Sequence, residues 1–318
     1  MEVIRTYNTM SHFSVFGAKF RKSDYKLVVC GTEEGKINIY DVKGNRPLKF
    51  LSNNPKSKHL GPIHCCSFMS DHQICSASDD KTVKLWDLAS GELIRDIGVS
   101  DASVASTVKP HMDYIRALCV VPDSQLIVSG SYDHRVKVWD SRDSNETPKF
   151  SFSLECPVED VIHRGSLLLA CGAKKINIYD LIAGKLIKSI ENTHSKTITS
   201  LYNYDKFVLS SSLDGHVKIY DSLFNVVTSL SFAPSQLLSL CVNSNTLVVG
   251  ANDGLVISRN FKSVENNDVK QLQKNEKQKR YFTWLREEAA KEEQQMEVED
   301  EAVIVKKRAN TRQFLQRY

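Results

Sequence analysis

Three sets of histidine, serine and aspartate recur along the chain at a spacing that could support nucleophilic catalysis. In each set a histidine precedes an aspartate by 20 to 22 residues, and a serine lies between them. A histidine held by a carboxylate can accept the proton of a serine hydroxyl, which is the chemistry of hydrolase triads. The sets are His59, Ser76 and Asp80; His111, Ser129 and Asp133; and His194, Ser210 and Asp214.

The repetition of this set favours a structural role over catalysis. A catalytic site is needed once, whereas a network that stabilises a repeated fold is needed in each repeat. A turn carboxylate accepts bonds from backbone N–H groups and from the histidine, and the serine can link to an aromatic ring. We therefore predict a structural network with no catalytic residue, which includes His59, Asp80, Trp86, His111, Ser129, Asp133, Trp139, His194, Ser210, Asp214 and Tyr220.

The elements that carry these residues repeat six times. Each copy has a short apolar strand, a turn and a second strand, and five copies end in an aromatic residue followed by aspartate. The spacing between those aspartates is 40 to 53 residues, and side chains alternate in character within the strands. This pattern is typical of four-stranded propeller blades. The copies span residues 28–41, 74–87, 127–140, 168–180, 208–221 and 248–260.

Three copies depart from the pattern. The fourth has a shorter turn without an acid, so we expect it to lack the network. The first has Glu34 in place of aspartate and no histidine at the expected position. The sixth keeps Asp253 and has lost the aromatic–aspartate ending.

Composition narrows the function classes. The 318 residues carry a net charge of +4, which is too small to indicate nucleic-acid binding by the whole chain. The N-terminus has no apolar segment typical of a secretory signal, and no run of 18 apolar residues predicts a membrane span. Most of the eight cysteines lie in apolar runs and none forms a C-x-x-C pair, so we predict no metal site and a reducing compartment. Phosphate-loop, zinc-protease and nucleophile-elbow motifs are absent, so we predict no cofactor and no enzyme activity.

The repeats resemble the WD-repeat family, most specifically in SASDDKTVKLWD (76–87) and SGSYDHRVKVWD (129–140). The resemblance covers residues 13–260 and implies an all-β propeller with six recognisable repeats, either six-bladed or an incomplete seven-bladed ring. In a six-bladed ring, Glu2–Tyr7 would add the outermost strand of the last blade. We predict the propeller over residues 1–262 and a charged, partly helical tail over residues 263–318.

A closer resemblance is to one branch of this family, the WD-repeat subunits of the small-subunit processome that are associated with the U3 small nucleolar RNA. It rests on the acid-free fourth repeat, the last repeat VVGANDGLVIS (248–258) and the basic tail. It implies a nucleolar scaffold of ribosome biogenesis whose partners are other processome proteins and, directly or indirectly, pre-ribosomal or small nucleolar RNA. Members of this branch carry a further N-terminal blade and a helical C-terminal domain, and we expect this chain to lack both.

The tail separates its charges into blocks. Its last block has five basic residues and no acid over residues 303–318. The basic residues Lys306, Lys307, Arg308 and Arg312 could form an RNA contact or a nuclear address, or could be a solvated linker end. The alternative function is an adaptor of another complex, such as a ubiquitin-ligase substrate receptor.

Overall fold

Antiparallel sheets follow one another along the chain, each built from consecutive strands. The computed structural model describes residues 6–7, 13–51, 57–98, 110–143, 147–243 and 246–260. Blade 1 contains β1 (Val15–Phe20), β2 (Leu27–Thr32), β3 (Ile37–Asp41) and β4 (Pro47–Leu51). Blade 2 contains β5 (Ile63–Phe68), β6 (Gln73–Ser78), β7 (Val83–Asp87) and β8 (Leu93–Ile97). Blade 3 contains β9 (Ile115–Val121), β10 (Leu126–Ser131), β11 (Arg135–Asp140) and β12 (Phe150–Ser153), with a 3-10 turn at Pro122–Ser124.

The second half of the described chain continues the series. Blade 4 contains β13 (Asp160–Arg164), β14 (Leu167–Gly172), β15 (Lys175–Asp180) and β16 (Lys185–Glu191). Blade 5 contains β17 (Ile198–Tyr204), β18 (Phe207–Ser212), β19 (His216–Tyr220) and β20 (Val226–Ser231). Blade 6 contains three described strands, β21 (Leu237–Asn243), β22 (Thr246–Ala251) and β23 (Val256–Asn260).

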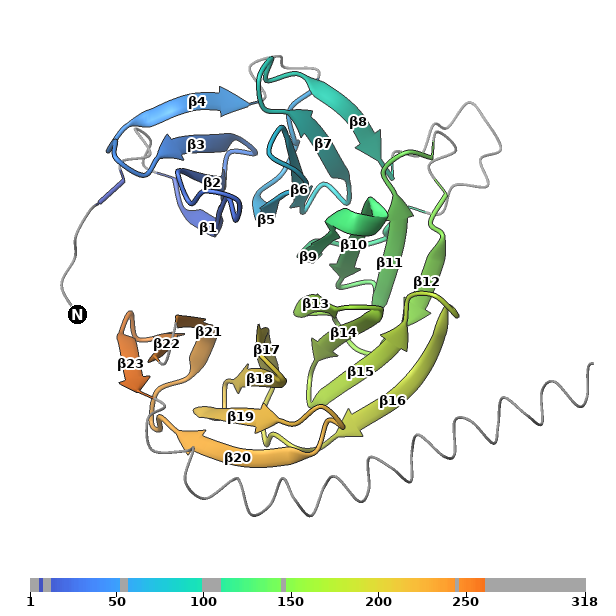
Figure 1. The fold of residues 1–318 in the computed structure, drawn as a ribbon, viewed down its shortest axis with the longest axis vertical. Coiled ribbons are helices and arrows are strands. Elements are labelled where there is room, and N and C mark those ends of the chain that lie inside the picture. The colour runs from blue at the N-terminus through green and yellow to red at the C-terminus, as the bar shows by residue number, and fades with distance from the viewer. Residues whose placement is uncertain are drawn as a thin grey trace, which may run out of the picture. The chain divides into compact units, whose positions relative to one another are not determined.

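The six sheets are arranged around a common centre, with the first strand of each sheet innermost (Figure 1). Consecutive sheets pack through these inner strands, as β5 packs on β1 and β9 packs on β5. The described chain is therefore a six-bladed β-propeller, which confirms the predicted fold class. No ladder of hydrogen bonds joins the described strands of blade 1 to those of blade 6.

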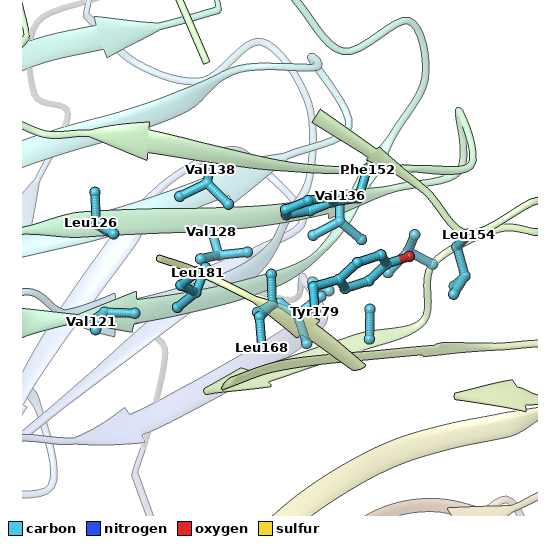
Figure 2. Close-up of a cluster of buried hydrophobic side chains, with 14 residues drawn as sticks. Val121, Leu126, Val128, Val136, Val138, Phe152, Leu154, Leu168, Tyr179 and Leu181 are labelled. Carbon is cyan, nitrogen blue, oxygen red and sulfur yellow. The ribbon is translucent and has the colours of Figure 1, made fainter. Parts of the chain in front are cut away.

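The core lies between neighbouring blades, where clusters of buried side chains join blades 1 and 2, 2 and 3, 3 and 4, and 4 and 5. Figure 2 shows the cluster between blades 3 and 4, where Val128 and Val138 from one sheet meet Leu168 from the next. The rings of Phe152 and Tyr179 stack across this interface with centroids 4.3 Å apart. The alternating apolar positions of the sequence thus supply the contacts that hold adjacent sheets together.

The structure tests the predicted position of the N-terminal segment at Thr6 and Tyr7. Thr6 and Tyr7 are not in a strand, and Tyr7 contacts blade 1, where its ring lies 5.3 Å from that of Tyr40 and its hydroxyl donates to the Val42 carbonyl at 3.1 Å. The predicted pairing with the last blade is therefore wrong for Tyr7, while residues 2–5 lie outside the described residues.

The contacts within the chain divide it into two compact units, Met1–Arg259 and Asn260–Tyr318. The tail beyond residue 260 lies outside the described residues, and the boundary at residue 262 stays a prediction.

Candidate functional site

The predicted network is assembled in blade 2. His59 lies in the segment before β5, Ser76 in β6, Asp80 in the β6–β7 turn and Trp86 in β7. His59 Nδ1 lies 2.7 Å from Asp80 Oδ2, and His59 Nε2 lies 2.7 Å from Ser76 Oγ. The indole N–H of Trp86 donates to the same Ser76 Oγ at 2.9 Å. Four side chains from four segments therefore form one continuous chain of hydrogen bonds.

The same arrangement recurs in blade 3. His111 Nδ1 lies 2.8 Å from Asp133 Oδ2, and His111 Nε2 lies 2.8 Å from Ser129 Oγ. Trp139 Nε1 donates to Ser129 Oγ at 2.8 Å.

Blade 5 has a variant of the network that uses tyrosine. His194 lies 3.0 Å from Asp214 Oδ2 and 2.8 Å from Ser210 Oγ. The Tyr220 hydroxyl lies 3.2 Å from Ser210 Oγ and 3.0 Å from Thr193 Oγ1. The geometry of blades 2, 3 and 5 thus brings every predicted member of the network together.

Each turn aspartate also binds the backbone. Asp133 accepts bonds from the N–H groups of Met112 at 2.9 Å and Arg135 at 3.0 Å. Asp80 makes the corresponding bond to the N–H of Leu60 at 3.0 Å. The carboxylate thus fastens the segment that enters a blade to the turn inside it, as a turn acid is suited to do.

The protonation states follow from burial and hydrogen bonding. Burial opposes ionisation of Asp133, but the bonds it accepts from His111 and from backbone N–H groups outweigh burial and lower its pKa to about 2. Burial lowers the pKa of His111 despite the neighbouring carboxylate. Neutral His111 therefore donates from Nδ1 to Asp133 and accepts the Ser129 hydroxyl proton at Nε2, while Ser129 Oγ accepts the Trp139 N–H.

These trios resemble a catalytic triad in connectivity, but their serines are not accessible at the surface. Ser76, Ser129 and Ser210 are fully buried. In blades 2 and 3 the serine oxygen is also occupied by a tryptophan N–H. Burial and these contacts favour a structural role for the trios, and that role stays a prediction. Across the residues that the structure describes, no three or more His, Cys, Asp or Glu side chains are grouped so that they could hold a metal ion.

Blades 1 and 4 use asparagine in place of the histidine network. In blade 4, Asn177 Nδ2 donates to the Tyr179 hydroxyl at 3.0 Å, and that hydroxyl donates to the Ser153 carbonyl at 3.0 Å. Asn38 donates to Tyr40 at 3.4 Å in blade 1, where Glu34 forms an ion pair with Lys36. The expected absence of the network from the fourth repeat agrees with this geometry.

Sequence reasoning missed a set of bulged residues on the innermost strands. In β5, Ile63 and Cys65 pair with Ser78 and Ala77, so one extra residue is inserted between them. A β-bulge of this kind re-aims the extra side chain. The bulged residues, which share no residue type, are Phe16, His64, Arg116, Thr199 and Leu238, and β13 has no such shift.

Three bulged residues contact one another at the junctions of blades 1, 2 and 3. The Phe16 ring lies 4.6 Å from the His64 ring, and the Arg116 guanidinium donates to His64 Nδ1 at 3.2 Å. His64 Nε2 lies 3.0 Å from Asp79 Oδ2, and Arg116 stands over the Tyr132 ring at 5.2 Å. Each bulged residue directly follows the first residue of its innermost strand, but no shared residue type marks this position in the sequence.

The structure does not test the basic residues of the tail that were predicted as an RNA contact or a nuclear address. Lys306, Lys307, Arg308 and Arg312 lie outside the described residues. No helix in the described part is long and apolar enough to span a membrane.

Repeated four-stranded sheets tied by His–Asp–Ser–aromatic networks define a WD-repeat β-propeller. A family model described as "WD domain, G-beta repeat" matches residues 184–221. A second model, "Nucleolar protein 10-like, N-terminal domain", matches residues 3–161, half of the chain. The chain belongs to this nucleolar protein 10-like family of β-propellers.

Matches to individual proteins are more specific than the matches to family models. The chain is 33% identical over 297 residues to "U3 small nucleolar RNA-associated protein 15 homolog" of Xenopus tropicalis, which covers 90% of this chain and 53% of that protein. It is 31% identical over 288 residues to "U3 small nucleolar RNA-associated protein 15" of Saccharomyces cerevisiae, covering 85% of this chain and 53% of that one. The chain spans about half the length of the curated relatives it matches. These matches confirm the resemblance found in the repeats.

A solved structure supports the fold alone. The computationally designed Ika8 protein is similar with a TM-score of 0.61 at 23% sequence identity, over 78% of this chain and 71% of that one.

Proposed function

We propose that this chain is a non-enzymatic scaffold subunit of the small-subunit processome in the nucleolus. In this role it acts in ribosome biogenesis, in pre-ribosomal RNA transcription and in processing toward the small-subunit ribosomal RNA. The observation that carries the proposal is the similarity to the frog and yeast U3 small nucleolar RNA-associated proteins, which covers 90% and 85% of this chain. Its partners are other processome proteins and, directly or through them, pre-ribosomal or small nucleolar RNA.

The physical basis of this function is the placement of surfaces. Interlocked sheets with buried cores hold their turns and edges in fixed relative positions, which is what a scaffold provides. The buried serines argue against catalysis by the repeated trios. The proposal includes no membrane contact and no small-molecule substrate.

Affinity purification tests the proposal. The tagged full chain is purified from its own cells, and U3 RNA is quantified against an unrelated small nuclear RNA. We expect enrichment of U3 RNA and of processome proteins. Recovery of ubiquitin-ligase subunits without U3 RNA would support the adaptor alternative and contradict the proposal.

Depletion tests the role in processing. We expect small-subunit ribosomal RNA to fall and its precursors to accumulate on RNA blots, and the tagged protein to lie in the nucleolus. Unchanged precursors, or a uniformly cytoplasmic protein, would contradict the proposal.

A further inference from the structure

The β1–β2 turn of blade 1 concentrates positive charge. Residues 19–26, KFRKSDYK, contain four basic residues and one acid, in a chain whose total net charge is only +4. The segment includes the end of β1, which is the innermost strand of its sheet in Figure 1. A local cluster of this kind governs contacts with polyanions more than the small net charge does.

The single acid of the segment is already paired. Arg21 Nε donates to Asp24 Oδ1 at 2.9 Å, and Arg21 Nη2 donates to Asp24 Oδ2 at 2.6 Å. The Lys26 N–H donates to the same carboxylate at 3.0 Å. Within the described residues, Lys19, Lys22 and Lys26 form no ion pair, and all three are exposed. Three cations are thus available to a ligand.

Two exposed aromatic residues lie in the same segment as these cations. Phe20 is 51% exposed and Tyr25 is 64% exposed. Tyr25 has a φ of 54°, and its N–H donates to the Arg21 carbonyl at 2.9 Å. The Arg21 N–H donates in turn to the Leu27 carbonyl at 2.9 Å. The turn therefore holds an uncommon left-handed conformation for an aromatic residue, with its ring in solvent.

The positive charge extends toward the inner strand of blade 4. Burial lowers the pKa of His163 in β13, and the charge of Lys22 lowers it further. The charge of Lys19 partly offsets the effect of burial, which raises the pKa of Asp160 in the same strand. Lys19 and Lys22 thus influence the titration of two groups on that strand.

Exposed rings interleaved with unpaired cations fit single-stranded nucleic acid better than an acidic peptide. Lysines track the phosphates while aromatic side chains stack on bases, whereas an acidic peptide would have no use for the rings. We propose that residues 19–26 bind single-stranded RNA, with phosphates at Lys19, Lys22 and Lys26 and bases stacked on Phe20 and Tyr25. The choice of RNA as the polyanion rests on the proposed function.

Fluorescence anisotropy with the purified full chain and a labelled oligouridylate tests whether the three lysines bind RNA phosphates. A Lys19→Ala/Lys22→Ala/Lys26→Ala variant is compared with a control that loses the same charge, in which three exposed lysines of blades 4 and 5 are replaced: Lys174→Ala/Lys185→Ala/Lys196→Ala. Loss of three phosphate contacts should reduce the slope of log affinity against log salt by about 2 and weaken binding at least tenfold at 0.1 M salt. Binding by other parts of the chain is common to both variants. Equal losses in the two variants would overturn the proposal.

Two variants of Tyr25 distinguish binding of RNA from binding of an acidic protein. Tyr25→Asn keeps a residue that tolerates the left-handed backbone but removes the ring, and it should weaken binding about tenfold, while Tyr25→Phe should not. Unchanged RNA binding by Tyr25→Asn, with equal competition by polyglutamate, would indicate an electrostatic site for acidic protein and overturn the proposal.

Crosslinking gives a readout that does not depend on a variant. Ultraviolet crosslinking of the unmodified chain to a 4-thiouridine oligonucleotide should yield a peptide joined to RNA at Phe20 or Tyr25. Crosslinks confined to other peptides would overturn the site. If the triple-lysine variant still enriches U3 RNA and processome proteins from cells, the proposed function stands without this contact.

Discussion

Replacement of Asp133 by alanine tests the repeat network at its carboxylate. Asp133 accepts bonds from His111, Met112 and Arg135, and its side chain is only 6% exposed. Without the carboxylate, the His111 Nδ1–H loses its acceptor at a buried position, whereas the two backbone N–H groups can bond to water. A buried unsatisfied donor costs about 1–3 kcal/mol, and a hydrogen bond to a charged group contributes about 1.5–3 kcal/mol. We expect Asp133→Ala to lower the free energy of unfolding by about 3 kcal/mol.

Asp253 provides a matched control in the corresponding turn of blade 6. It accepts bonds from the Leu255 N–H at 3.2 Å and the Ser235 hydroxyl at 2.8 Å, but no histidine binds it in the described chain. Its bonds lie at the surface, so Asp253→Ala should change stability by less than about 1 kcal/mol. In thermal melts these changes correspond to a fall in melting temperature of roughly 6–12 °C for Asp133→Ala and of less than about 4 °C for Asp253→Ala. Equal melting temperatures for the two variants would refute the network reasoning.

The lowered pKa of Asp133 predicts that the stability of the protein depends on pH. The folded state lowers the pKa of Asp133 to about 2, below the unfolded value near 3.8. The resulting stabilisation, about 2 kcal/mol, is fully present above pH 4 and is lost as the pH falls toward 2. Urea unfolding of the unmodified chain between pH 5 and pH 2.5 should show this loss, and Asp133→Asn should reduce its size. An identical pH profile for the variant would contradict the assignment.

Three further predictions concern packing, thiol reactivity and the asparagine network. Gly172→Ala should destabilise the protein by about 1–3 kcal/mol because its Cβ would overlap the Pro157 carbonyl oxygen, whereas the Cβ of Gly250→Ala meets only the flexible Ser239 hydroxyl. Chemical denaturation compares the stabilities of the two variants. Cys241 is exposed, so native labelling by a maleimide should modify it first, as intact mass will show, and labelling unchanged in Cys241→Ser would contradict this. Asn177→Leu should lower stability by about 1–2 kcal/mol in the same denaturation assay because the Tyr179 and Ser189 hydroxyls lose a partner, and no loss would argue against the asparagine network.

The network was predictable because each member has its own signal at a fixed spacing. His111, Asp133 and Trp139 differ in chemistry and recur in register with the strands, so their meeting followed from the repeat alone. Burial of Ser129, which decides between structure and catalysis, required the packing of the whole sheet.

The bulged residues were not predictable in the same way. A bulge is a property of backbone pairing, and Phe16, His64 and Arg116 have no common side-chain chemistry. The asparagine network had a visible signal in the shared NIY sequence of repeats 1 and 4, but its partners Ser153 and Ser189 lie in strands without a motif. Tyr7 was misplaced because a short apolar segment does not specify which sheet it will join.

The uneven placement of the histidine networks has a consequence for local unfolding. Blades 2, 3 and 5 contain them, whereas the described residues of blades 1, 4 and 6 do not, and blades 1 and 6 also stand at the two ends of the series of sheets. In an architecture where each repeat packs mainly on its neighbours, local opening starts in the repeats with the fewest stabilising contacts. Amide hydrogens of blades 1 and 6 should therefore exchange before those of the middle blades. Such a protein keeps a persistent centre while its terminal sheets open and reclose, so a partner that binds there can trap an opened form without unfolding the whole propeller.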